Sequence, residues 1–179
     1  MSRTTKKRAV SQNKRSVLLR GELNMKNTKI ISGFPAIGKS FIFKNSDKSV
    51  IDSDSSEFSW AQDLDGNNTK VRNPRFPKNY INYIQDNIGR VDFIMVSSHD
   101  VVREALCDNE ISYTIVYPDI SLKDEFLERF INRGNDKNFI DFLSINWDKF
   151  INEISNETYP TKIILEKGQY LSDVLEKIK

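Results

Sequence analysis

The sequence is poor in the residues that build disulfide frameworks and zinc sites. Its 179 residues include a single cysteine, Cys107, and a single histidine, His99. One cysteine cannot form an internal disulfide. Cys107 and His99 together supply only two of the four Cys or His ligands of a usual structural zinc site. We therefore expect a protein of a reducing, cytoplasmic environment.

Long apolar runs are also missing. No stretch approaches the roughly 20 apolar residues that a membrane-spanning helix needs, and no apolar segment of a secretory signal follows the basic start of the chain. With 38% hydrophobic and 29% charged residues, the composition is that of a soluble globular protein. The length suits one domain with a sizeable core, and no membrane partner is expected.

Charge is distributed unevenly along the chain. Residues 1–24 contain seven basic side chains and one acidic one, whereas the remainder has an acidic balance. Few apolar residues and no periodicity predict a disordered tail before a folded domain at 25–179. The tail is either a basic arm that binds nucleic acid or a leader without a role, in which case the natural chain starts at Met25.

One stretch contains a specific motif, because residues 33–40 match G-x-x-x-x-G-K-[ST] at every fixed position. An apolar run at 28–32 predicts a buried strand before it, and 40–44 predicts a short helix after it. This is the context of a phosphate-binding loop, whose glycines admit phosphate oxygens, whose lysine reaches the β and γ phosphates in catalysis and whose hydroxyl binds Mg²⁺. The predicted donor-binding residues are Gly33, Phe34, Pro35, Ala36, Ile37, Gly38, Lys39, Ser40 and Phe41.

A short β-prone run that begins at Lys48 ends in two aspartates, Asp52 and Asp54. Residues spaced by two in an extended chain point to the same side, and ligands of open α/β sheets gather beyond the carboxyl ends of the strands. We expect Asp52 to order the water shell of Mg²⁺ and Asp54 to accept the proton of a hydroxyl that attacks the γ phosphate. The alternative is a polar turn without chemistry.

The stretch from 58 to 78 is polar, and its turn signals predict a long loop. Two interpretations of its aromatic and basic residues stay open. In the first, Trp60, Arg72, Arg75 and Phe76 bind the acceptor by stacking on a base or pairing with a phosphate. In the second, the aromatic residues only attach the loop to the core.

The rest of the chain alternates apolar runs with helical patterns. Strands are predicted at 28–32, 48–52, 91–96, 113–117 and 161–165. Helices are predicted at 40–44, from 78 to 88, at 101–106, at 122–132, at 139–154 and at 170–178, with Leu122, Phe126 and Phe130 and also Ile88, Val101 and Phe142 facing inward. Such alternation predicts an α/β fold with a five-stranded parallel sheet, right-handed crossovers and helices on both faces.

The third predicted strand ends in Ser97 and Ser98. A Walker B aspartate would be expected there, and its absence assigns the metal-ordering role to Asp52. Ser98 is a candidate cap for the next helix. His99 is interpreted as a residue of the first helical turn, not as a catalytic base.

Two arginines of the helix predicted at 122–132 and its end, Arg129 and Arg133, are four residues apart and share a face. Over a phosphate site they would neutralise the charge that develops on a transferred phosphoryl group. We interpret them as a catalytic lid. The alternative is a solvated charged face that Glu125 balances in part.

The order of these parts resembles the nucleoside monophosphate kinase-like branch of P-loop proteins over roughly residues 28–179. The triplet 52–54 looks like the D-x-D of shikimate kinases, in which the first aspartate serves the magnesium and the second contacts the acceptor hydroxyl. Arg129 and Arg133 look like lid arginines. The glycine triplet with which shikimate kinases hold their substrate is missing, which argues against shikimate as the acceptor.

The resemblance also implies a place for the adenine of the donor. Gly168 and Gln169 stand in the exit loop where this branch holds the base. The stretch 72–83 and the residues 96–99 are similar to small, often phage-encoded nucleotide kinases. This similarity implies a nucleoside or nucleotide acceptor.

The sequence thus predicts a small ATP- and Mg²⁺-dependent kinase with a nucleoside triphosphate donor and a small acceptor, a nucleoside or nucleotide. Two other functions stay open. One is a kinase acting on DNA, at a 5′ end or a hydroxymethylated base, which the basic tail would favour. The other is a nucleotide-binding ATPase or switch without a small acceptor.

Overall fold

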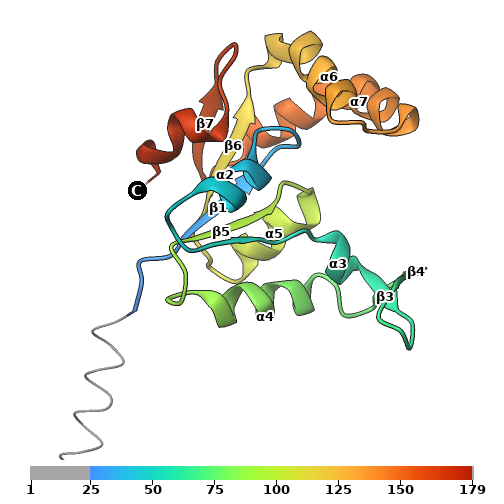
Figure 1. The fold of residues 1–179 in the computed structure, drawn as a ribbon, viewed down its shortest axis with the longest axis vertical. Helices are drawn as coiled ribbons and strands as arrows, with labels where there is room; N and C mark the ends of the chain where they lie inside the picture. The colour runs from blue at the N-terminus through green and yellow to red at the C-terminus, as the bar shows by residue number, and fades with distance from the viewer. Residues whose placement is uncertain (1–24, 179) are drawn as a thin grey trace, which may run out of the picture.

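The computed structural model describes residues 25–178. The prediction of a disordered basic tail at 1–24 lies outside the described residues. Between the described ends the chain forms one central sheet, a separate hairpin and helices on both sides of the sheet (Figure 1).

Five parallel strands form the central sheet in the order β2-β5-β1-β6-β7. Their bounds are β1 (Lys29–Gly33), β2 (Val50–Asp52), β5 (Phe93–Ser97), β6 (Thr114–Pro118) and β7 (Thr161–Leu165). The interior strands are apolar on both faces because helices cover both faces. The predicted fold class, an α/β three-layer sandwich of the P-loop type with a five-stranded parallel sheet, is confirmed.

Register brings the carboxyl ends of neighbouring strands to one edge of the sheet. Gly33 at the end of β1 is paired with Ser97 at the end of β5 and with Val116 of β6. Asp52 at the end of β2 is paired with Met95, two residues before the end of β5. The residues that follow β1, β2 and β5 therefore start from the same edge.

The helices follow the predicted places with small shifts. Their bounds are α2 (Lys39–Asn45), α3 (Ser56–Ser59), α4 (Lys78–Asn87), α5 (Asp100–Asp108), α6 (Lys123–Asn132), α7 (Lys137–Asn156) and α8 (Leu171–Val174), with 3-10 turns η1 (Ile120–Leu122) and η2 (Leu175–Lys177). The last predicted helix is thus divided into α8 and η2. Helix α4 contacts α5, α2 contacts α8, and α6 contacts α7, which lies beside it (Figure 1).

The stretch predicted as a long loop contains secondary structure. β3 (Trp60–Gln62) and β4 (Asn68–Arg72) form an antiparallel hairpin, which lies apart from the central sheet beyond α3 (Figure 1). The Thr69 hydroxyl donates to the Ala61 carbonyl at 2.7 Å, and the Asp63 carboxylate closes the turn by accepting from backbone N–H groups. These short strands are mostly exposed and polar, so they lack the apolar signal from which a strand is predicted.

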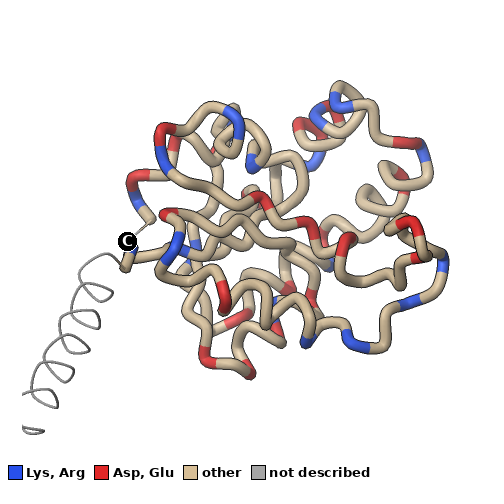
Figure 2. The backbone as a smooth tube through the Cα atoms, turned by 60° about the horizontal axis from the view of Figure 1, so that its bottom comes forward, with Lys and Arg blue, Asp and Glu red and all other residues tan. Residues whose placement is uncertain are grey.

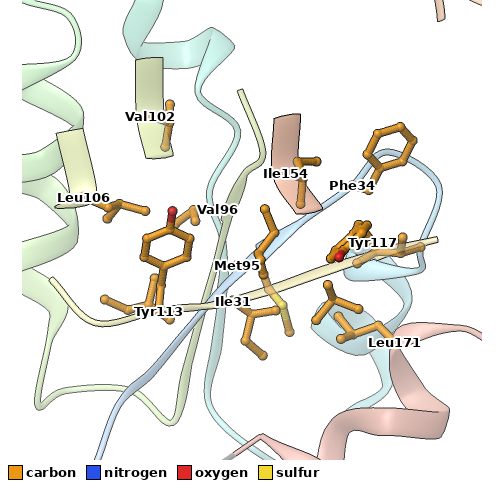
Figure 3. Close-up of a cluster of buried hydrophobic side chains, with 14 of the residues drawn as sticks. Ile31, Phe34, Met95, Val96, Val102, Leu106, Tyr113, Tyr117, Ile154 and Leu171 are labelled. Carbon is orange, nitrogen blue, oxygen red and sulfur yellow. The ribbon is translucent and has the colours of Figure 1, made fainter. Parts of the chain in front are cut away.

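Aromatic side chains fill the core between the phosphate-binding loop and α6 and α7. Trp147 is fully buried, its ring centroid lies 5.5 Å from that of Phe34, and its Nε1 donates to the Ile120 carbonyl at 2.7 Å. Figure 3 shows Ile154 of α7 and Leu171 of α8 on opposite sides of the strands. The core therefore has a layer on each face of the sheet.

The inward-facing residues were predicted correctly in most positions. Leu122, Phe126 and Phe130 are buried, whereas Ile88, Val101 and Phe142 are exposed. These three predictions were wrong because each residue lies at the edge of its apolar stripe or, for Ile88, just past the end of α4. Tertiary packing covers only the centre of such a stripe.

Asp92 joins three segments at the opposite end of the sheet. Its Oδ2 accepts from Lys26 Nζ at 2.7 Å, from the Ser49 N–H at 2.8 Å and from Ser49 Oγ at 2.6 Å. The hydrogen bond from Lys26, followed by those from Ser49, holds the pKa of Asp92 well below its ordinary value of 3.8. The charged carboxylate is therefore the form that stabilises the fold.

A pH-dependent loss of stability follows. Because the folded-state pKa is lowered, the contribution of Asp92 is complete above about pH 4 and is lost as the pH falls towards the folded-state value. We expect Asp92→Asn to be less stable than the wild type at pH 7, with a difference that shrinks below pH 4. Urea unfolding at several pH values measures it, with Asp108→Asn on the exposed end of α5 as the control. A difference that stays constant down to pH 2.5 would contradict the prediction.

Candidate functional site

The loop between β1 and α2 has the backbone of a phosphate-binding loop. Gly38 has φ +99° and Ala36 has φ +62°, conformations that turn successive N–H groups towards a common centre. A Cβ at Gly33 would lie 2.7 Å from Ile37 Cδ1 and 2.8 Å from Lys39 Cδ. Steric contact thus explains the glycine at Gly33, and backbone conformation explains Gly38.

Gly33→Ala is expected to displace the stem of Lys39 more than it disturbs the fold, because the atoms in the way belong to flexible side chains. We predict at least a roughly tenfold loss of affinity for a fluorescent ATP analogue, the size expected of overpacking of this kind. Thermal unfolding should change little. Gly66→Ala in the hairpin turn, which adds backbone strain but meets no atom within 4 Å, is the control. Equal affinities for Gly33→Ala and the wild type would show that the loop tolerates the methyl group.

Lys39 follows Gly38 and lies under the loop. Its Nζ donates to the Gly33 carbonyl at 2.5 Å and is 3.4 Å from the Phe34 carbonyl oxygen. Burial lowers the pKa of Lys39 to about 8, while Asp52 acts against this shift and Arg133 adds to it. An anion bound in the loop would favour the charged ammonium.

Ser40 of α2 and Asp52 at the end of β2 bring together two oxygen atoms that could bind a metal ion. Ser40 Oγ donates to Asp52 Oδ2 at 2.8 Å. Asp54 follows two residues later, and its Oδ1 accepts only the Ser56 N–H, at 2.9 Å, among the described residues. Its other oxygen therefore remains free to accept a proton or a hydrogen bond.

These groups line one cavity of about 670 Å³ at the carboxyl edge of the sheet. This volume falls within the range of pockets for drug-sized ligands. The lining residues are Gly33, Pro35, Ala36, Ile37, Gly38, Lys39, Ser40, Phe41, Asp52, Ser53, Asp54, Ser97, Ser98, His99, Arg129, Asn132, Arg133, Asn135, Phe139 and Tyr170.

The two predicted lid arginines line this cavity in different settings. Arg129 is held on several sides, because its Nη2 donates to Glu125 Oε1 at 2.5 Å and to the Gln169 carbonyl at 2.8 Å, and its guanidinium lies 3.9 Å from the centroid of the Tyr170 ring. Arg133, the residue after α6, is exposed and acts on the pKa of Lys39. Arg133 is thus the more exposed of the two arginines, whereas Arg129 is fixed through Nη2 and keeps only its buried Nη1 unpaired among the described residues.

The exit loop after β7 is fastened to both the lid and the phosphate-binding loop. The Leu171 N–H donates to the Ile37 carbonyl at 2.8 Å, and the Gly168 N–H donates to Glu125. The ring of Tyr170 lies beside Gly38. Tyr170 of this loop lines the cavity. The two residues predicted to hold the adenine, Gly168 and Gln169, are not among the described residues that line it.

Three residues predicted to bind the acceptor, Trp60, Arg72 and Arg75, do not line the cavity. Arg72 stacks on Trp60, with 4.1 Å between its Cζ and the ring centroid, and Arg75 is exposed. Among the described residues that line the cavity none comes from the hairpin. In this structure the hairpin is therefore not part of the wall of the cavity.

Sequence reasoning missed several lining residues. Ser53, Asn132, Asn135 and Phe139 gave no motif signal, whereas their places after strands or near the end of α6 could have indicated them. His99 was interpreted as a helical residue, and it is the N-cap of α5, a position predicted for Ser98. Although His99 is exposed, partial desolvation by its neighbours lowers its pKa below the ordinary value, and Asp100 and Asp54 act in the opposite direction.

Comparison with known proteins adds no further assignment. No protein-family model matches the chain, and no curated protein matches it. Within residues 25–178, no helix has the length and apolarity to span a membrane.

Proposed function

We propose that the protein is a small ATP- and Mg²⁺-dependent kinase that phosphorylates a nucleoside or nucleotide. The observation that carries the proposal is the 2.8 Å contact between Ser40 Oγ and Asp52 Oδ2 in a cavity that also contains Lys39 and Asp54. A phosphate-binding loop, a pair of oxygen ligands and a free carboxylate are the parts that phosphoryl transfer requires.

The oxygen ligands that Ser40 and Asp52 offer fit magnesium. The Ser40 hydroxyl and the Asp52 carboxylate are hard oxygen ligands of the kind that Mg²⁺ prefers, and Mg²⁺ usually keeps several waters and phosphate oxygens. The described residues contain no group of three or more His, Cys, Asp or Glu side chains that could hold a metal ion. When bound, Mg²⁺ neutralises charge on the β and γ phosphates.

The chain's own residues supply the rest of the reaction. The acceptor hydroxyl attacks the γ phosphorus, the bond from that phosphorus to the β,γ-bridging oxygen breaks, and ADP leaves. Asp54 takes the hydroxyl proton. Lys39 holds the β and γ phosphates, and Arg133 approaches the phosphoryl group from the lid. Arg129 positions the exit loop against α6, where Tyr170 would border the adenosine end of the donor.

The deciding experiment incubates γ-labelled ATP and Mg²⁺ with panels of nucleosides, monophosphates and DNA. A chain beginning at Met25 is assayed beside the full chain. Label in a nucleoside or nucleotide, retained after removal of the tail, supports the proposal. Free labelled phosphate without a labelled acceptor would instead favour an ATPase or switch.

One observation favours DNA as a second candidate acceptor. The chain from β4 to the start of α4 contains four basic and no acidic residues between positions 68 and 78, namely Lys70, Arg72, Arg75 and Lys78, and Figure 2 shows basic positions along this segment. Basic side chains near an aromatic ring suit a nucleic-acid strand. Label that appears only in DNA, with binding that falls steeply with salt, would favour this function.

A further inference from the structure

We propose that the acceptor subsite, defined as Ser53, Asp54, Ser97, Ser98 and His99, binds a neutral hydroxyl-bearing acceptor such as a nucleoside and disfavours a phosphorylated one. The inference rests on the proposed kinase function and deepens it by naming the acceptor class. All five residues line the cavity. They come from the ends of β2 and β5, which are neighbours in the sheet.

Ser53 is the first part of the argument. It is 5% exposed, it lines the cavity, and its Oγ is buried without a hydrogen-bond partner among the described residues. Buried hydroxyl groups in folded proteins are nearly always paired. A hydroxyl or carbonyl oxygen of a bound acceptor would supply the missing partner.

The backbone holds Ser53 firmly in place. Its N–H donates to the Met95 carbonyl at 2.9 Å, and its carbonyl accepts from the buried Tyr80 hydroxyl at 2.9 Å. A movement of the loop backbone at Ser53 would therefore break these two hydrogen bonds. An unpaired group held by a fixed backbone is a preformed contact for a ligand.

The wall that follows β5 is also fixed. The Ser98 carbonyl accepts from Arg103 Nη1, and Arg103 Nε donates to Glu157 Oε1 at 2.5 Å in a largely buried ion pair. Ser97 Oγ accepts the His99 N–H at 3.3 Å, which leaves the hydroxyl proton of Ser97 available. The wall thus presents hydroxyl groups and an imidazole.

Charge decides against a phosphate at this place. None of the five residues of the acceptor subsite is a lysine or arginine. Of the cations that line the cavity, Lys39 belongs to the phosphate-binding loop, and the proposed function assigns Arg133 to the transferred phosphoryl group. Arg129 is held through Nη2 by Glu125 and the Gln169 carbonyl, and only its buried Nη1 is unpaired among the described residues. The end of β2 contributes two carboxylates, Asp52 and Asp54. A phosphomonoester, with a charge of about −1.5 to −2 at pH 7, would be repelled by these carboxylates without a dedicated arginine beside it.

The test separates acceptor binding from transfer. Nucleosides and their 5′-monophosphates are compared as acceptors of label from γ-labelled ATP, and binding of both to the full chain is measured by calorimetry with a non-hydrolysable ATP analogue. The variants are Ser53→Ala and, as a matched control, Ser59→Ala, a buried serine outside the cavity lining. Thermal unfolding is measured for each.

We expect nucleosides to be the better acceptors, and Ser53→Ala to raise the KM for the nucleoside about tenfold without changing the KM for ATP. Since Ser53→Ala removes an unpaired buried hydroxyl, its unfolding temperature should be unchanged or higher. Ser59→Ala should leave both KM values unchanged. A lower unfolding temperature for Ser53→Ala with unchanged nucleoside binding would overturn the inference, because the hydroxyl would then be structural.

Failure of the inference and failure of the proposed function give different results. If monophosphates accept the label and nucleosides do not, the proposed kinase function stands and the neutral subsite is wrong. If only DNA accepts the label, the neutral subsite is wrong and the second candidate function replaces the proposed one. If the ATP analogue binds but no acceptor binds or takes label, both are wrong.

Discussion

Replacement of Lys39 by alanine is expected to reduce phosphoryl transfer by about 10²–10³-fold, the usual loss when one charged or hydrogen-bonding group leaves a preorganised anion site. The Nζ of Lys39 now contacts the Gly33 and Phe34 carbonyls at the base of the loop, and in the proposed reaction it would move from there to the β and γ phosphates. Initial rates with γ-labelled ATP measure the loss, and affinity for a fluorescent ATP analogue should fall in parallel.

The control for Lys39→Ala is Lys44→Ala. Lys44 lies on the same short helix, α2, but is exposed and does not line the cavity. It should therefore retain full activity and nucleotide affinity. Full transfer by Lys39→Ala with a normal unfolding temperature would show that the loop does not hold the reacting phosphates.

Replacement of Asp54 by asparagine is expected to lower kcat by about 10²–10⁴-fold, the contribution typical of a general base. The variant keeps the shape of the side chain, and its amide oxygen can still accept the Ser56 N–H that now lies 2.9 Å from Asp54 Oδ1. The fold and the KM for ATP should therefore change little. Steady-state rates at saturating ATP, together with thermal unfolding, measure both expectations.

Two further carboxylates make the Asp54→Asn result interpretable. Asp65→Asn, in the exposed turn of the hairpin, should retain the wild-type rate. Asp52→Asn should instead raise the Mg²⁺ concentration needed for half-maximal rate, because Asp52 contacts Ser40. If Asp54→Asn transfers label at the wild-type rate, Asp54 belongs to a polar turn and the proton has another acceptor.

The parts of the fold that were predictable are those whose cause is local. Apolar runs predicted all five strands of the sheet within two residues of their observed bounds, because a strand covered on both faces must be apolar throughout. The loop motif predicted its own geometry, since Gly38 adopts a positive φ and Gly33 has no room for a Cβ. The order of strands then placed Asp52 and Asp54 beside the loop.

The hairpin and the separation of the two arginines could not be predicted. Thr69 is paired with Ala61 across the hairpin, and Arg129 is paired with the Gln169 carbonyl, 40 residues away along the chain. Periodicity reports which face of an element is apolar, but it contains no information about a distant hydrogen-bond partner. The shared helical face of Arg129 and Arg133 therefore predicted one role for both. Tertiary packing instead fixes Arg129 through Glu125 and the Gln169 carbonyl and leaves Arg133 exposed.

The sequence by itself determined the fold class and the backbone geometry of the loop at 33–40, because hydrophobic burial and backbone sterics act on neighbouring residues. Only the tertiary structure decided which polar side chains surround this loop. The unpaired hydroxyl of Ser53 and the adjacent wall of Ser97, Ser98 and His99 arise where two strands, about 40 residues apart in the sequence, meet at one edge of the sheet. Their chemistry depends on desolvation and on charges from other segments, which no local pattern encodes.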